Sequence, residues 1–424
     1  MAINMRARAL SVLSKVAQAD WPDRLNLRQS VEKLIFSGSR ASFRFAASRA
    51  SAKSHSPRRA DELFDLSLSE EQQMLVEMLG HFAREQLRPA AHDADAAQQV
   101  PQHLLDQITE LGLAQYGVSE AQGGLAGERT ILTTALIAEA LAYGDFSLAA
   151  SLLQPLSAAN CIRRWASAEQ QAQWLVDFMG EQPPIYSLAF AEAGVLQDPQ
   201  QLRTQAKTHG KHYLISGAKA LVLGGAQAQY FLLSAQTAQG PALFRVPAQS
   251  KGICCESAPA MGLRACGLTR VDFDKVKVPK NARLSGAELN YQQVLDYGAL
   301  AFCALAVGTA QAALDYVAGY CNERQAFGEP ISHRQGVAFM VADMAVELES
   351  MRMLLWRACS RAEQGLSFAR EAYLARLLCA EMAMKIGSDA VQLLGGHGFT
   401  KEHPVERWYR DLRSVAVISG ALHL

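Results

Sequence analysis

The sequence has 424 residues, of which 50% are hydrophobic, and its formal net charge is zero. This length is too great for one ordinary domain and predicts roughly two or three. The apolar content excludes a chain that is disordered throughout, and the zero net charge gives no reason to expect a nucleic-acid partner. The nearest approach to a membrane span, residues 299–313, contains Gly, Thr and Gln and favours a buried helix.

The N-terminal extension, residues 1–60, is basic, with 12 Lys or Arg residues against three acids. An Arg- and Ser-rich, acid-poor composition is typical of a mitochondrial transit segment, but a basic arm for peripheral contact with an anionic membrane fits equally well. An extension that docks on its own protein is the third interpretation. Residue usage elsewhere favours a bacterial cytoplasmic protein, with or without membrane association, and leaves the mitochondrial matrix as the alternative.

Residues 61–183 are predicted to form a helical domain. Ser69 followed by Glu70, Glu71 and Gln72 is a typical helix start, because the serine side chain can accept a hydrogen bond from a first-turn N–H group. Apolar residues then recur at helical spacing up to residue 82, over 104–111 and over 131–143. Gly112 is expected to end the second of these helices.

Residues 184–286 are predicted to form a β domain. Short β-type runs, separated by Gly, Gln and Ala turns, occupy residues 213–217, 221–223, 230–233, 242–246 and 269–278. No helical crossover separates the runs, so we expect an antiparallel sheet or a small barrel rather than a parallel sheet.

Residues 287–424 are predicted to form a helical bundle. Apolar residues between 337 and 358 advance by three or four positions, and this stripe ends at Gly365. Residues 371–394 form a second helix of this kind. The expected fold class is therefore mainly α with a central β domain.

The eight cysteines include no CxxC pair, and several lie in apolar helical runs. This pattern indicates reduced, buried thiols in an intracellular protein. The histidines have no metal-ligand spacing, so we expect no metal site.

Two C-terminal motifs carry the functional signal. The first is Arg324-Gln325-Ala326-Phe327-Gly328 with Gln335, and the second joins Gln392 to Gly395-Gly396. Either motif alone is explained by a helix end, and neither a GxGxxG turn after a strand nor a P-loop is present. Together, in this order, the motifs resemble the flavin-dependent acyl-CoA dehydrogenase family over residues 68–424.

The resemblance implies the family's fold, with a C-terminal four-helix bundle, and FAD as the cofactor. Arg324 would contact the FAD pyrophosphate across a dimer, Phe327 would pack on the cofactor and Gln335 would support it. Gln392, Gly395 and Gly396 would bring backbone close to the dinucleotide. Family membership also implies an acyl-CoA substrate, an electron-transfer flavoprotein as the partner, and homodimers or homotetramers.

The middle domain matches the family less well. Glu192, Gly194 and Asp198 agree with its pattern. Ala191 and Leu223 lack the hydroxyl groups that would bond the flavin, and Leu221 replaces the aromatic residue that flanks the ring. The resemblance therefore implies weaker flavin contacts on this side.

The catalytic position is the main departure. Dehydrogenation needs a base for the α-proton, commonly a glutamate, and this chain has Ser419-Gly420 at that place. The alternative position on the preceding long helix is Gly298, and Asp296 lies half a turn away from its face. Backbone at Ser419 and Gly420 could still polarise the thioester carbonyl. Two hypotheses stay open: α,β-dehydrogenation of an acyl-CoA with FAD, as in fatty acid β-oxidation, or a catalytically impaired acyl-CoA- and FAD-binding homologue or partner subunit.

Acids near these motifs are poor substitutes for this base. Glu406 and Asp411 lie among Arg407, Arg410 and Arg413 in the sequence, and we expect them to form solvated or interfacial ion pairs rather than to act as the base. Neither motif specifies the length or branching of the acyl chain.

Overall fold

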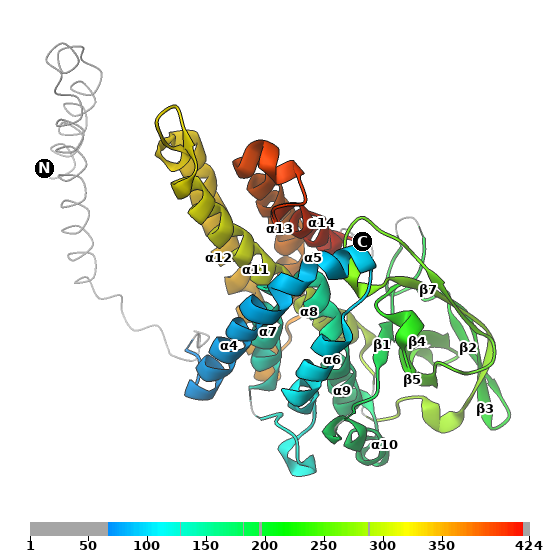
Figure 1. Ribbon diagram of the computed structural model, residues 1–424. Helices are drawn as coiled ribbons and strands as arrows, with labels where there is room; N and C mark the ends of the chain where they lie inside the picture. Colours follow the sequence, from blue (N-terminus) through cyan, green and yellow to red (C-terminus); the bar gives the residue numbers. More distant parts are fainter. Residues whose placement is uncertain (1–66, 128, 181, 195–196, 287–288, 419–424) are drawn as a thin grey trace, which may run out of the picture. The chain divides into compact units, whose positions relative to one another are not determined.

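The computed structural model describes residues 67–127, 129–180, 182–194, 197–286 and 289–418. The basic extension, Ser419 and Gly420 lie outside these residues. Three groups of elements follow one another along the described chain: helices, a sheet and long helices (Figure 1). This order confirms the predicted fold class.

The first N-terminal helix begins where the sequence predicts. Ser69 Oγ accepts from the Gln72 N–H at 3.2 Å and Gln72 Oε1 accepts from the Ser69 N–H at 3.1 Å, which is a complete capping box. A short π-helical stretch, Ala83–Leu87, joins the first two helices and was not expected. The helices of this group are α4 (Glu70–Phe82), α5 (Arg88–Ala97), α6 (Gln102–Glu110), α7 (Thr130–Ala142), α8 (Phe146–Leu152), α9 (Gln154–Trp165) and α10 (Ala168–Trp174).

The middle of the chain forms a 7-stranded sheet with the order β1-β4-β2-β3-β7-β6, and β5 pairs with β4. The strands are β1 (Tyr186–Ala189), β2 (Gln205–His209), β3 (His212–Val222), β4 (Tyr230–Thr237), β5 (Gly240–Pro247), β6 (Ile253–Ser257) and β7 (Thr269–Pro279). Buried side chains from several strands, among them Phe231 of β4 and Phe273 of β7, form the core of this part.

The sheet differs from the expectation in two respects. The runs 213–217 and 221–223 belong to one strand, β3, which is interrupted by register shifts rather than by a turn. In addition, β1 pairs with β4 in the parallel direction, and β2 and β4 share one parallel pair. The β2–β3 hairpin, rather than a helix, connects β1 to its parallel neighbour β4. This crossover was not predicted from the sequence, because only a helical one was expected to allow parallel pairing.

The C-terminal part is built on three long helices, which contact one another along their lengths. The helices are α11 (Tyr291–Glu323), α12 (Gln335–Glu363), α13 (Ala369–Leu394) and the short α14 (Val405–Leu412), and a small hairpin of β8 (Gln325–Ala326) and β9 (Glu329–Pro330) joins α11 to α12. Met344, Leu348, Met351, Leu355 and Ala358 of the predicted α12 stripe are buried. This stripe is the face that closes the bundle.

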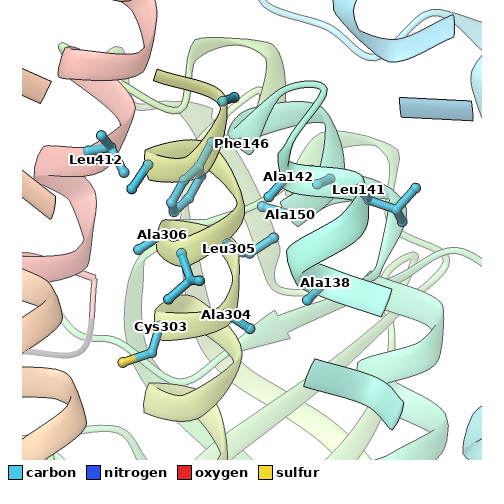
Figure 2. Packing of buried hydrophobic residues seen from close by; sticks show 14 of the residues in the cluster. Ala138, Leu141, Ala142, Phe146, Ala150, Cys303, Ala304, Leu305, Ala306 and Leu412 are labelled. Carbon is cyan, nitrogen blue, oxygen red and sulfur yellow. The ribbon is translucent and has the colours of Figure 1, made fainter. Parts of the chain in front are cut away.

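Helix α11 is the central element of the described chain. It is the one described helix long and apolar enough to cross a membrane, but 67% of its apolar window is buried inside the protein. Figure 2 shows Leu305 of α11 on the side of the helix toward Ala142 of α7 and Ala150 of α8. The predicted buried helix is therefore a core helix, and it connects the N-terminal helices with the sheet.

All eight cysteines are free thiols, and five of them are buried, whereas Cys254 and Cys255 are exposed on β6. Within the described ranges, no group of three His, Cys, Asp or Glu side chains is arranged to hold a metal ion.

Candidate functional site

Two adjoining cavities lie beside the first turns of α11. The outer cavity, of 520 Å³, is lined by the segment after β1, the end of β3, the start of α11 and Ala416 to Ile418. The inner cavity, of 160 Å³, lies among α7, α8, α9 and α11. The residues that line both cavities are Gln154, Leu188, Phe190, Val294, Gly298 and Phe302. The two spaces therefore meet at a common wall.

Gly298 stands at this wall. A Cβ atom built on Gly298 would have no heavy atom within 4 Å, because its missing side chain faces open space. The position therefore has room for a side chain at the junction of the two cavities.

Among the described residues that line the outer cavity, Glu192 is the one carboxylate. Its oxygens already accept hydrogen bonds from other residues of the chain. It accepts from Lys219 Nζ at 2.8 Å, from the Thr204 N–H at 3.0 Å and from the Arg203 N–H at 2.7 Å. Burial alone raises the pKa of Glu192, but the Lys219 ammonium and the hydrogen bonds outweigh it and hold the pKa below its usual value. This carboxylate holds strands together and is not free to take a proton from a ligand.

Asp296 lines neither cavity. Its Oδ1 accepts from Gln292 Nε2 at 2.7 Å, and its Oδ2 is buried without a hydrogen-bond partner. Burial raises the pKa of Asp296, and the bond from Gln292 offsets this in part. The carboxyl lies off the face of α11 that carries Gly298, which agrees with its spacing in the sequence.

The wall contributed by β3 is irregular. Leu221 has a φ of 52°, within the register shift between Lys219 and Val222. Such a backbone is costly for a branched residue, and it persists only where the surroundings impose it. The Ala220 N–H donates to the Ala191 carbonyl at 2.9 Å, which joins the bulge to the segment after β1.

The outer cavity has features that fit a flat cofactor ring. Its walls include the small residues Ala191, Ala193, Gly194 and Ala220, which leave backbone accessible. Gln197 also lines it, and the Gln197 Oε1 is buried without a partner. This acceptor is available to an N–H donor of a bound ring, although the hydroxyl groups that the family places here are absent.

The two FAD motifs lie at another place, on the exposed end of the long helices (Figure 1). Arg324, Phe327 and Gln335 belong to the α11–α12 connection, and Gln392, Gly395 and Gly396 to the end of α13; all six are exposed. Tyr320 Oη and His397 Nδ1, 3.0 Å apart, link the two connections. Both predicted FAD motifs therefore lie at the same end of the helical bundle.

These residues are far from the cavities of the same chain. Helix α11 has 33 residues and is about 50 Å long at 1.5 Å per residue. The cavities lie at its first turns and Arg324 directly follows its last turn. One bound dinucleotide is too short to touch both regions of a single chain.

The predicted charged cluster around α14 is only partly buried, and Glu406 and Arg410 form an ion pair at 2.7 Å. Asp411 is fully buried and has no ion pair among the described residues; its Oδ1 accepts from the Leu263 N–H at 2.7 Å and its Oδ2 from Ser147 Oγ at 2.8 Å. Arg407 pairs with buried Asp145 at 2.9 Å. The expectation of solvated or interfacial ion pairs was wrong for Arg407 and Asp411, because α14 packs between α8 and α13, whereas Glu406 and Arg410 form an ion pair as expected. Burial and Asp145 raise the pKa of Asp411 to about 7.

Several lining residues were not predicted from the sequence. Gln154, Phe302 and Gln197 have no local signal, because their role depends on which elements meet. Arg164 lines the inner cavity, and the Arg163-Arg164 pair near the end of α9 was a visible signal. A charged pair on a helix is ordinarily assigned to solvent, so the signal was not used.

Comparisons with known proteins agree with this geometry. Models of the N-terminal, middle and C-terminal domains of acyl-CoA dehydrogenase match residues 69–181, 187–276 and 286–423. The short-chain specific acyl-CoA dehydrogenase of Bos taurus is 31% identical over 84% of this chain and 88% of its own. The butyryl-CoA dehydrogenase of Megasphaera elsdenii aligns with a TM-score of 0.78 and 26% identity over 84% of this chain and 96% of its own. The FAD complex of PigA aligns with a TM-score of 0.77 and 26% identity over the same shares.

The two cavities at Gly298, the paired motifs at the bundle end and the match of all three domains have one explanation: the chain belongs to the acyl-CoA dehydrogenase family, whose members use FAD to dehydrogenate acyl-CoA thioesters.

Proposed function

We propose that the chain binds the FAD ring in the outer cavity and the acyl chain of an acyl-CoA in the inner cavity, and that it dehydrogenates the Cα–Cβ bond at their junction. The observation that carries this proposal is the common wall at Gly298, which gives the reacting carbons a place beside the ring. FAD, when bound, supplies the hydride acceptor. The chain's own residues orient the thioester and exclude water.

Removal of the α-proton is the step for which the chain is poorly equipped. A carboxylate in an apolar pocket suits this step, because burial raises its pKa toward the working pH. We infer from the sequence that Ser419 stands at the family's base position, and a serine hydroxyl is no base unaided. The backbone N–H groups of Ser419 and Gly420 would still polarise the thioester carbonyl. We therefore expect ligand binding with slow dehydrogenation.

A second function is favoured by the chemistry of the described walls. Glu192 is engaged by Lys219, and Leu221, Leu223 and Ala191 provide no hydroxyl group to a flavin. These features suit a homologue that holds FAD and acyl-CoA without turnover, or that serves as the partner subunit of an active paralogue.

The visible absorption spectrum of FAD-loaded protein separates the two functions. Butyryl-, hexanoyl- and octanoyl-CoA are added in turn without oxygen. Bleaching of the flavin band supports dehydrogenation, whereas a shift without bleaching supports binding alone. Failure to retain FAD after reconstitution contradicts both functions, because each requires bound FAD.

Gly298→Glu tests whether a missing base limits the reaction. The new carboxylate enters open space at the junction, since no heavy atom lies within 4 Å of a Cβ there. A positioned base contributes about 10²–10⁴-fold, so anaerobic flavin reduction is expected to accelerate by that order. Gly298→Gln, of equal size but without basicity, is the matched control, and Ser419→Glu tests the other position.

Equal rates in Gly298→Glu, Ser419→Glu and the parent chain, with acyl-CoA still bound, would show that the base is not the limiting defect. The lost flavin contacts around Leu221 would then be the cause. A gain in Gly298→Gln as large as in Gly298→Glu would show an effect of packing rather than of proton transfer.

We also propose that FAD is shared between two copies of the chain, with Arg324, Phe327, Gln335, Gln392, Gly395 and Gly396 of one copy completing the outer cavity of the other. The length of α11 supports this arrangement. An electron-transfer flavoprotein is the proposed acceptor of the electrons, as the resemblance implies.

A further inference from the structure

The inner cavity has a polar wall away from its junction with the outer cavity. Thr134, Asn160, Arg164 and Tyr297 line it there and do not line the outer cavity. Arg164 Nη1 donates to Tyr297 Oη at 3.0 Å, and its guanidinium lies 4.1 Å from the centre of the Tyr297 ring. Asn160 and Arg164 are four residues apart on α9 and so share a face.

Arg164 forms no direct ion pair within the described part of the chain. Its hydrogen bond to Tyr297 uses one of five N–H donors. The acid that faces it, Glu363, accepts from the N–H groups of Ile131 and Leu132 at 3.0–3.2 Å and so caps α7. Glu363 is therefore already committed to a helix end.

A second cation lies beside the first. Arg163 Nη2 donates to Asn160 Oδ1 at 3.1 Å, and Arg163 Nε is buried without a partner. Burial, together with Arg164, lowers the pKa of Arg163 to about 10. Two guanidinium groups against one capped carboxylate leave excess positive charge at this wall.

A purely apolar acyl chain gains nothing from such a wall. Partial burial of an unpaired guanidinium is costly, and an anion that enters the cavity would remove the cost. A guanidinium matches the geometry of a carboxylate, because two parallel N–H groups can bond its two oxygens. The remaining lining is mostly apolar, including Ala135, Ala138 and Leu305, and suits methylene groups.

We propose that Arg164 is a specificity-determining residue that binds a carboxylate at the distal end of the acyl chain, so that the substrate class is the mono-CoA thioesters of short dicarboxylic acids. The inference rests on the proposed binding of acyl-CoA in the inner cavity. The cavity of 160 Å³ is close to the roughly 150 Å³ that holds one benzene molecule, which corresponds to a chain of about six carbons.

The test compares two thioesters of equal length. FAD-loaded protein is titrated with hexanoyl-CoA and with the mono-CoA thioester of hexanedioic acid, and binding is followed by calorimetry and by the flavin band. Hydrogen bonds to a charged group correspond to roughly 10–100-fold in affinity, so the dicarboxylic thioester is expected to bind more tightly by that factor.

The variants identify the residue. Arg164→Met keeps an unbranched apolar stem but removes the guanidinium group, so it is expected to abolish or reverse the preference, while Arg164→Lys keeps part of it. Arg163→Met is the matched control, because Arg163 does not line the cavity, and it is expected to keep most of the preference. Thermal melting verifies that each variant is folded.

Equal or weaker binding of the dicarboxylic thioester by the parent chain would overturn the inference and leave the proposed function standing. The parent comparison needs no variant, so a folding defect in Arg164→Met cannot mask this result. Failure of both thioesters to bind would overturn the proposed function and the inference with it. A preference that survives in Arg164→Met would show that a group other than Arg164 binds the distal carboxylate.

Discussion

Asp411 is a carboxylic acid held in the interior by two hydrogen-bond donors, and it has no ion pair among the described residues. The Leu263 N–H and Ser147 Oγ bond its two oxygens, and Asp145 lies near enough to repel a second negative charge. Burial disfavours the ionised form first, and Asp145 adds to this effect, so the pKa of Asp411 rises from 3.8 to about 7. Ile418, which lines the outer cavity, follows Asp411 by seven positions.

Asp411→Asn is therefore expected to change the pH dependence of stability. Since the folded pKa is raised, the folded state binds a proton more tightly than the unfolded state. Its contribution to stability is complete below about pH 4 and is lost as the pH rises to about 7. Asparagine has no such loss, so the free energy of unfolding of the variant should gain on the parent by up to about 1.4 kcal/mol per pH unit within this window.

Urea unfolding of both proteins at pH 5, 6, 7 and 8, at one protein concentration, measures this difference. Ser151→Ala is a suitable control. Ser151 lies on α8, the helix whose Ser147 bonds Asp411, but its hydroxyl group cannot titrate in this range. A stability difference between Asp411→Asn and the parent that is constant with pH would contradict the raised pKa.

Residues with a local cause were predictable, and residues with a tertiary cause were not. The capping box at Ser69 depends on Gln72 alone, so four letters of sequence suffice. The left-handed backbone of Leu221 depends on the pairing of β3 with β7, which the sequence does not display. Arg164 likewise lines a cavity only because α7, α9 and α11 enclose a space beside it, and the sequence does not show this.

At the scale of elements, the crossing of α7 and α11 depends on Gly308. A Cβ atom on Gly308 would lie 2.0 Å from the Glu139 carbonyl oxygen and 3.1 Å from the Ala142 Cβ. Thr309 Oγ1 donates to the Ala142 carbonyl at 2.9 Å in the same buried contact. The two helices approach so closely that one methyl group has no space, and they also form two walls of the inner cavity.

Gly308→Ala is expected to destabilise the protein by about 1–3 kcal/mol, because the helices must separate. Differential scanning fluorimetry should detect this as a lower melting temperature. Gly319→Ala, on the same helix and exposed with nothing within 4 Å of the new methyl group, is the matched control. It is expected to be neutral or stabilising by up to about 1 kcal/mol, since alanine favours a helix over glycine. Destabilisation of both variants alike would show that close packing is not the reason.

Long helices were easier to predict than strands. The apolar stripe recurs between residues 337 and 358 of the 29-residue α12, so its period identifies the buried face without knowledge of its partner. Strands β1 and β2 have four and five residues, too few to show a period, and both were missed. The parallel pairing of β1 with β4 joins segments more than 40 residues apart and has no local signal.

At the scale of the molecule, one helix separates the two halves of the predicted FAD site. The outer cavity is lined by α11 residues from Val294 to Phe302, and Arg324 follows the last turn of this helix, about 33–45 Å further along it. A cofactor that needs both halves therefore requires two chains. In a two-fold symmetric dimer each chain would supply the cavity of one site and the arginine of the other.

Mixed dimers test this arrangement. Arg324→Glu opposes the pyrophosphate, and Ala193→Trp fills the outer cavity from an exposed position, so either variant alone is expected to lose FAD during gel filtration. Equal mixing after dissociation gives one half mixed dimers, each with one intact site and one doubly altered site. The flavin absorbance should then return to about a quarter of the parent value per chain. If both halves instead served a cofactor within one chain, every chain in the mixture would remain defective and no absorbance would return.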